Sequence, residues 1–117
     1  MEFYYHGVDE NVLILSADGG LDAMNAREFV AILERVIQAG PRKLLVDCTQ
    51  LTYISSYGIG LLGQLHSTLA RQGGHVKLAA VRGKVAKLLE LSGLNQTFEI
   101  YTSVDDALVA FREVDFE

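Results

Sequence analysis

The stretch LLVDCTQLTYISSYGIGLL, residues 44–62, decides the fold of this chain. The apolar run at 43–48 is typical of an interior strand that is covered on both faces. At the other end of the stretch, Ser55 and Ser56 precede glycines and leucines that fall on one face of a helix. A strand therefore leads through a loop into a helix, and the two serines lie where that helix begins.

The segments on either side alternate between strand and helix patterns. The N-terminal part predicts strands at 3–6 and 12–17, joined by a polar turn, and a tight turn at Gly19 and Gly20. A helix follows over 21–40, with Asp22 as its N-cap and Gly40 just past its C-terminal end. Beyond the serine helix, the pattern predicts a strand at 75–81, a helix at 84–94 with Gly93 as terminator, a strand at 97–101, and a helix opened by Ser103 and Asp106 in capping-box spacing.

The resulting order, β-β-α-β-α-β-α-β-α, defines the fold class as α/β. Strands that alternate with helices become parallel neighbours through right-handed crossovers. The two N-terminal strands form a hairpin, so we expect a mixed, mostly parallel sheet with this hairpin at one edge and about four helices. No linker or internal repeat divides the 117 residues, which predicts a single domain over 1–117.

Composition narrows the range of functions. Half of the residues are hydrophobic and the net charge is −5, which favours a globular domain and argues against nucleic-acid binding. The single Cys48 lies among apolar residues and suits a reducing compartment, where we expect it in the core. Neither a signal peptide nor a membrane-spanning run is evident, so the expected location is the cytoplasm.

The serine pair admits several chemical interpretations. A serine hydrolase would need glycines on both sides of the serine and a nearby base, but Ile54 precedes the pair and the three histidines lie elsewhere. A phosphate-binding loop would need a lysine and further glycines, and a metal site would need clustered ligands. We therefore predict no enzyme, no cofactor and no metal. A structural N-cap and a serine modified by another protein both remain open.

The same stretch resembles the signature of the STAS domain of bacterial anti-sigma factor antagonists. That signature has an apolar strand, an Asp, an apolar pair, and then D-S-S-G-L-G-x-L. Other parts of the chain are similar to the family as well: ADGGLDAMNAREF at 17–29, and the segment from Gly73 to Leu108. The resemblance implies a STAS fold, in agreement with the α/β order derived from the residues.

Carried over position by position, the resemblance makes Ser56 the phosphorylated serine. Asp47 matches the Asp at the strand end, and Gly58 and Gly60 match the two glycines, with Ile59 between them. Two positions depart from the pattern: Ser55 stands where the family often has Asp, and Tyr57 where it usually has a small residue. The partner-binding surface implied in this way consists of Asp22, Asp47, Ser55, Ser56, Tyr57, Gly58, Ile59 and Gly60.

The resemblance also implies a mechanism. The unphosphorylated protein would bind an anti-sigma factor of the serine kinase type, phosphorylation of Ser56 would break that complex, and a serine phosphatase would restore it. Gly58 and Gly60 would let the kinase backbone come close to Ser56. The alternative is a STAS domain that does not switch, as a scaffold in stress signalling or an accessory subunit of a membrane transporter complex. A homodimer remains open.

Overall fold

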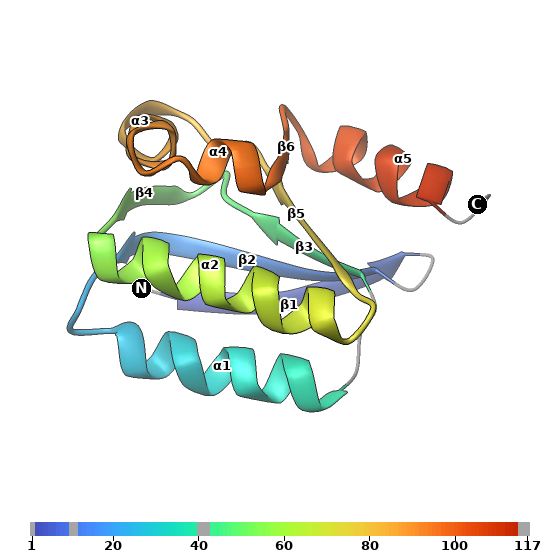
Figure 1. Ribbon diagram of the computed structural model, residues 1–117, viewed down its shortest axis with the longest axis horizontal. Helices are drawn as coiled ribbons and strands as arrows, with labels where there is room; N and C mark the ends of the chain where they lie inside the picture. Colours follow the sequence, from blue (N-terminus) through green and yellow to red (C-terminus); the bar gives the residue numbers. More distant parts are fainter. Residues whose placement is uncertain (1, 10–11, 40–42, 115–117) are drawn as a thin grey trace.

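The chain forms one mixed sheet with helices packed against it (Figure 1). The computed structural model describes residues 2–9, 12–39 and 43–114. The sheet has the strand order β1-β2-β3-β5-β6, and β4 pairs with β2 outside this path. Only β1 is antiparallel to its neighbour, β2. The strands are β1 Glu2–Asp9, β2 Val12–Leu21, β3 Lys43–Asp47, β4 Leu51–Ile54, β5 His75–Ala79 and β6 Glu99–Tyr101.

Helices cover both faces of this sheet. In Figure 1, α1 and α2 lie side by side across one face and α5 lies on the other. The α3 helix packs beside β4, and the single turn of α4 follows it. The helices are α1 Ala26–Ala39, α2 Ser56–Arg71, α3 Gly83–Ser92, α4 Leu94–Thr97 and α5 Val104–Val114.

The central strand β3 supplies both halves of the core. Successive side chains of a strand point to opposite faces. Leu44 and Val46 accordingly belong to the larger cluster under α1 and α2, whereas Leu45 packs with Phe111 of α5. All three β3 side chains are buried, which confirms the expected interior strand covered on both faces. Burial at both faces fixes the register of β3, and with it the position of the serine segment that follows.

The α/β class, the mixed sheet, the edge hairpin and four long helices are confirmed, but several boundaries were wrong. β2 continues to Leu21, so Gly19 and Gly20 lie within a strand and not in a tight turn. Gly19 has a φ of 103° where the register with β4 shifts, and glycine tolerates this conformation because it has no Cβ. The residues before Ser55 form β4, and α4 was also not predicted. Gly40 lies outside the described residues.

Candidate functional site

Ser55 is the N-cap of α2. Its backbone is extended, with φ −79° and ψ 167°, and its Oγ accepts a hydrogen bond from the backbone N–H of Gly58 at 3.1 Å. Its carbonyl oxygen accepts the first helical bond, from the N–H of Ile59 at 2.9 Å. Serine is favoured at this position because its short side chain satisfies an N–H group that has no partner within the helix. The hydroxyl of Ser55 is therefore engaged in holding the helix start.

Ser56 is the first helical residue, and its side chain is exposed. Its hydroxyl makes no hydrogen bond to any other described residue, unlike that of Ser55. The unpaired N–H groups of the first helical turn surround it with a field that favours negative charge. Tyr57 follows directly and is 58% exposed, so its ring stands in solvent beside the serine. Of the two serines, Ser56 is the one whose hydroxyl an approaching protein can reach.

The two glycines of the motif have different surroundings. A Cβ on Gly58 would lie 2.9 Å from both Ile54 Cγ1 and Leu21 Cγ, so this glycine allows α2 to pack closely on the ends of β2 and β4. Gly60 is exposed, and a Cβ there would meet nothing within 4 Å. Ile59 is 9% exposed and belongs to the core. The side that remains open to a partner is therefore that of Ser56, Tyr57 and Gly60.

Asp47 orders the loop between β3 and β4. Its Oδ1 accepts hydrogen bonds from the N–H and the hydroxyl of Thr49, at 3.0 and 2.5 Å, and its Oδ2 accepts one from Ser16 at 3.3 Å. These hydrogen bonds orient the loop, as short acidic side chains commonly do by bonding nearby backbone groups. Asp47 thus acts on the serine segment through the backbone that leads into β4.

Asp22 does not cap a helix, contrary to the prediction. The α1 helix begins at Ala26, and Asp22 instead accepts hydrogen bonds from the N–H groups of Met24 and Asn25, at 2.9 and 3.1 Å. Asn25 in turn donates to the carbonyl oxygen of Gly20 at 2.7 Å. Asp favours tight turns for the same reason as it favours N-caps, since its side chain bonds nearby N–H groups. Asp22 therefore shapes the turn between β2 and α1.

Three apolar side chains on the segments around Ser56 are exposed, and Met24 and Tyr53 among them were not predicted from the sequence. Met24 in the β2–α1 turn is 92% exposed, and Tyr53 on the outward side of β4 is 46% exposed. Tyr53 pairs with Gly20 in the β2–β4 ladder, which brings β4 beside the β2–α1 turn. We call Met24, Tyr53 and Tyr57 the apolar rim of Ser56. Exposed apolar groups close together are typical of protein–protein contact surfaces.

The remaining candidate groups lie apart from Ser56. Cys48 is buried, and burial with the neighbouring Asp47 raises the pKa of its thiol to about 12, which confirms the core position. His66 lies more than two turns further along α2, with its ring against that of Phe98. Within the part of the chain that the structure describes, no three His, Cys, Asp or Glu side chains are grouped to hold a metal ion.

Comparison with known proteins now assigns the family. The sequence model of the STAS domain matches residues 7–107, which is most of the chain. The chain belongs to the STAS domain family. This assignment confirms the resemblance and the prediction that the chain is not an enzyme, since STAS domains of this kind are regulatory domains.

Relatives within the STAS family carry regulatory names. The chain is 29% identical over 103 residues to the anti-sigma-F factor antagonist RsfB of Mycobacterium tuberculosis, covering 86% of this chain and 82% of that protein. It superposes on the crystal structure of an anti-sigma factor antagonist from Mycobacterium paratuberculosis with a TM-score of 0.85 and 25% identity, over 95% and 93% of the two chains.

The Bacillus cell fate determinant SpoIIAA, solved in its phosphorylated form, shares the STAS fold. The TM-score is 0.73 at 19% identity, over 94% of this chain and 99% of that one. In the described ranges, none of the STAS domain's helices is both long and apolar enough to cross a membrane.

Proposed function

We propose that this STAS domain is an anti-sigma factor antagonist, that it binds an anti-sigma factor of the serine kinase type, and that phosphorylation of Ser56 switches it off. The exposed, unbonded hydroxyl of Ser56 at the start of α2 is the observation that carries the proposal. The neighbouring Ser55 is engaged in the cap, which leaves Ser56 as the acceptor. The names of the relatives support the regulatory part of this assignment.

A phosphate on Ser56 would change the contact surface without disturbing the fold. It would add a charge of about −1.5 to −2 at a helix N-terminus, where the field of the helix tolerates it. Because Ser56 is exposed, no core side chain needs to move. In a complex, however, the same charge would be desolvated against the partner, and a loss of roughly 4 kcal/mol weakens binding about a thousandfold.

The apolar rim gives the partner a surface to bind before phosphorylation. Met24, Tyr53 and Tyr57 are exposed on three segments that meet near the start of α2. Aromatic residues and methionine are enriched at the centres of protein–protein contacts. We expect the anti-sigma factor to cover this rim, so that a phosphate on Ser56 would lie within the contact. Asp22 and Asp47 hold the β2–α1 turn and the β3–β4 loop in place through their hydrogen bonds.

A serine phosphatase would remove the phosphate from Ser56 and so restore binding. We expect the domain to act in the cytoplasm, as its sequence predicts.

The direct test is phosphorylation by a purified kinase-type anti-sigma factor with ATP, followed by mass spectrometry of the intact protein. We expect the gain of one phosphate in the parent protein and none in Ser56→Ala. Ser67→Ala, which removes an exposed serine further along α2, is the matched control and should be phosphorylated like the parent. Full phosphorylation of Ser56→Ala would show that another residue is the acceptor.

The second candidate function is a STAS scaffold that does not switch. The exposed Tyr57 ring beside Ser56 favours it, because this bulk hinders the entry of Ser56 into a kinase active site. A scaffold would bind its partner with the same affinity when Ser56 carries Glu, and it would not accept phosphate. These two results together would replace the switch with the scaffold.

A further inference from the structure

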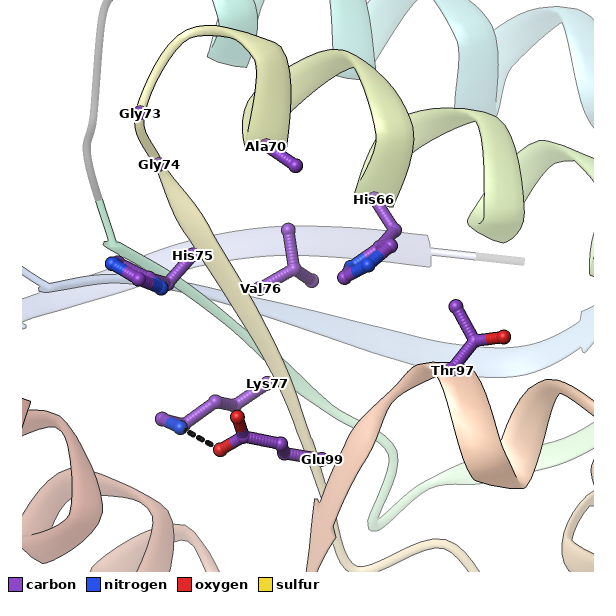
Figure 2. A pocket seen from close by; sticks show the side chains of 9 residues that line it. All are labelled: His66, Ala70, Gly73, Gly74, His75, Val76, Lys77, Thr97 and Glu99. Atoms are coloured by element: carbon purple, nitrogen blue, oxygen red, sulfur yellow. Dashed lines mark hydrogen bonds and ion pairs between the residues drawn. The ribbon is translucent and has the colours of Figure 1, made fainter.

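A second site lies at the opposite end of α2, at the edge of the sheet. The edge strand β6 has three residues and pairs only with Lys77, Leu78 and Ala79 of β5. Among the residues that the structure describes, no strand therefore lies on the outer side of the beginning of β5, and a hollow of about 270 Å³ opens there. Figure 2 shows this hollow between α2, β5 and the end of α4, lined by His66, Ala70, Gly73, Gly74, His75, Val76, Lys77, Thr97 and Glu99.

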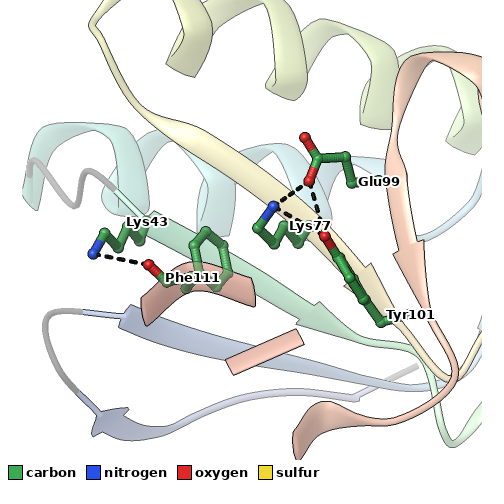
Figure 3. A network of polar contacts seen from close by, with 5 residues as sticks. All are labelled: Lys43, Lys77, Glu99, Tyr101 and Phe111. Carbon is green, nitrogen blue, oxygen red and sulfur yellow. Dashed lines mark hydrogen bonds and ion pairs between the residues drawn. The ribbon is translucent and has the colours of Figure 1, made fainter. Parts of the chain in front are cut away.

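Lys77 is the fixed cation of this hollow. Its side chain is only 4% exposed, and its Nζ lies 5.2 Å from the ring centroid of Tyr101 and 5.0 Å from that of Phe111 (Figure 3). Aromatic faces attract a cation but do not neutralise its charge. A buried ammonium group needs an anion nearby, because removing that anion leaves an uncompensated buried charge.

Glu99 supplies that anion from an exposed position. Its carboxylate accepts hydrogen bonds from Lys77 and from the Tyr101 hydroxyl, and the hydrogen bond from Lys77 is the main cause that lowers the pKa of Glu99. In contrast to Lys77, the Glu99 side chain is 67% exposed. Glu99 can therefore turn into solvent when another anion takes its place beside Lys77, whereas Lys77 is held by its packing. Glu99 is also the one acidic residue among those that line the hollow.

The other groups of the hollow lie on both sides of the β5 edge. The Nδ1 atom of His66 is buried and has no hydrogen-bond partner among the described residues. Figure 2 shows its ring directed from α2 into the hollow, with the Thr97 side chain on the facing wall. His75 lies close enough to Glu99 to lower the pKa of its carboxyl group. Ala70 and Val76 add apolar surface.

We propose that this hollow binds a small organic carboxylate, which displaces Glu99 from Lys77. The volume is near the lower end of the range of about 300–1,000 Å³ that is typical of small-molecule sites, so it favours a compact ligand. A single lysine matches a single negative charge, whereas a doubly charged phosphate would leave one charge without a partner. The carboxylate binds Lys77 on the side of β5 that faces α5. The hydrocarbon body lies across the open edge of β5, against the apolar wall of Ala70 and Val76.

This site is independent of the switch proposed for Ser56. Ser56 and Ala70 are separated by fourteen residues of α2, which is about 20 Å along the helix axis at ~1.5 Å per residue. Ser56→Ala should therefore bind the carboxylate as the parent does. An experiment that contradicts one of the two proposals therefore does not contradict the other.

The test is a titration of the full chain, labelled with ¹⁵N, with benzoate as the probe, followed by NMR. We expect saturable shifts of the amide signals of Gly73, Gly74 and Val76. Benzamide, which has the same shape without the charge, should bind at least about tenfold more weakly, and so should inorganic phosphate. The absence of saturable shifts, or equal binding of benzamide, would overturn the proposal. Tighter binding of phosphate would overturn the assignment to carboxylates.

Two variants separate the roles of the charged pair. Glu99→Gln removes the internal competitor, so benzoate should bind about two- to fivefold more tightly. Glu90→Gln, the same change on the exposed side of α3, is the control and should have no effect. Lys77→Met should lose about tenfold or more in affinity. Because Lys77→Met could fail to fold, the comparison of Glu99→Gln with Glu90→Gln decides alone: equal affinities of the two variants would contradict the proposal.

Discussion

The hydroxyl of Ser55 accepts a hydrogen bond from the backbone N–H of Gly58 at 3.1 Å, and this bond distinguishes two serines that are adjacent in the sequence. Ser55 holds the start of α2, whereas Ser56 presents a free hydroxyl to solvent at the first helical position. The motif that the chain resembles often has Asp at this position, and its carboxylate would accept the same bond. The departure at Ser55 therefore preserves the geometry and removes one negative charge.

Replacement of Ser55 should affect stability through the cap. Ser55→Ala leaves the N–H of Gly58 without its partner and should lower the free energy of unfolding by about 1 kcal/mol. Ser55→Asp keeps the acceptor and adds a favourable charge at the helix N-terminus, so it should be at least as stable as the parent. Urea unfolding measures the free energy of unfolding of both variants. Ser67→Ala, on the exposed side of α2, should be neutral, and a similar loss in that control would argue against the cap.

The two glycines of the motif form a second matched pair. Gly58→Ala forces a methyl group to within 2.9 Å of Ile54 and Leu21, and overpacking of this kind costs about 1–3 kcal/mol. Gly60→Ala adds a methyl group in open space on a helix and should stabilise the domain by about 0.5–1 kcal/mol. The midpoints of denaturant unfolding measure this difference in stability between the two variants. Gly58→Ala with unchanged or increased stability would show that α2 does not need this close approach.

The ion pair of Lys77 and Glu99 predicts a dependence of stability on pH. The hydrogen bond from Lys77 lowers the pKa of Glu99 below its ordinary value of 4.5 in the folded state. The stability that this carboxylate contributes is therefore complete above that ordinary value and is lost as the pH falls through the lower value of the folded state. The parent and Glu99→Gln should differ in free energy of unfolding at neutral pH and converge in acid. A difference that is constant with pH would contradict this assignment.

Cys48 should be inert in the native domain. Burial raises the pKa of its thiol to about 12, so almost no thiolate exists at about pH 8, and the sulfur has no access to solvent. Iodoacetamide should leave the native protein unmodified and alkylate it fully in urea. Mass spectrometry of the native and the urea-treated samples measures the extent of alkylation. Rapid alkylation of the native protein would mean that the loop after β3 opens readily.

Elements with strong local signals were predicted well from the sequence. Gly93 ends α3 with a φ of 82°, a conformation that glycine adopts without strain. Ser103 accepts a hydrogen bond from the N–H of Asp106 at 3.0 Å, as its capping spacing predicts. In these places the residues that determine the structure lie within a few positions of one another, so the sequence alone suffices.

Features that depend on distant contacts were not predicted. β4 is a strand because it pairs with the extended end of β2, thirty or more residues earlier in the chain. The exposure of Met24 likewise follows from how the turn shaped by Asp22 meets the sheet. Asp22 was assigned to the wrong element because a cap and a tight turn use the same side-chain hydrogen bond. Local patterns do not distinguish these alternatives.

The central claim, that phosphorylation of Ser56 ends binding to the anti-sigma factor, is tested most directly by calorimetry with a purified kinase-type anti-sigma factor. The unphosphorylated domain should bind, and the domain that carries phosphate on Ser56 should bind about a thousandfold more weakly, which corresponds to roughly 4 kcal/mol. Ser56→Ala treated with kinase and ATP should retain its affinity, which separates the effect of the phosphate from that of the treatment. Equal dissociation constants for the phosphorylated and unphosphorylated domains would contradict the account.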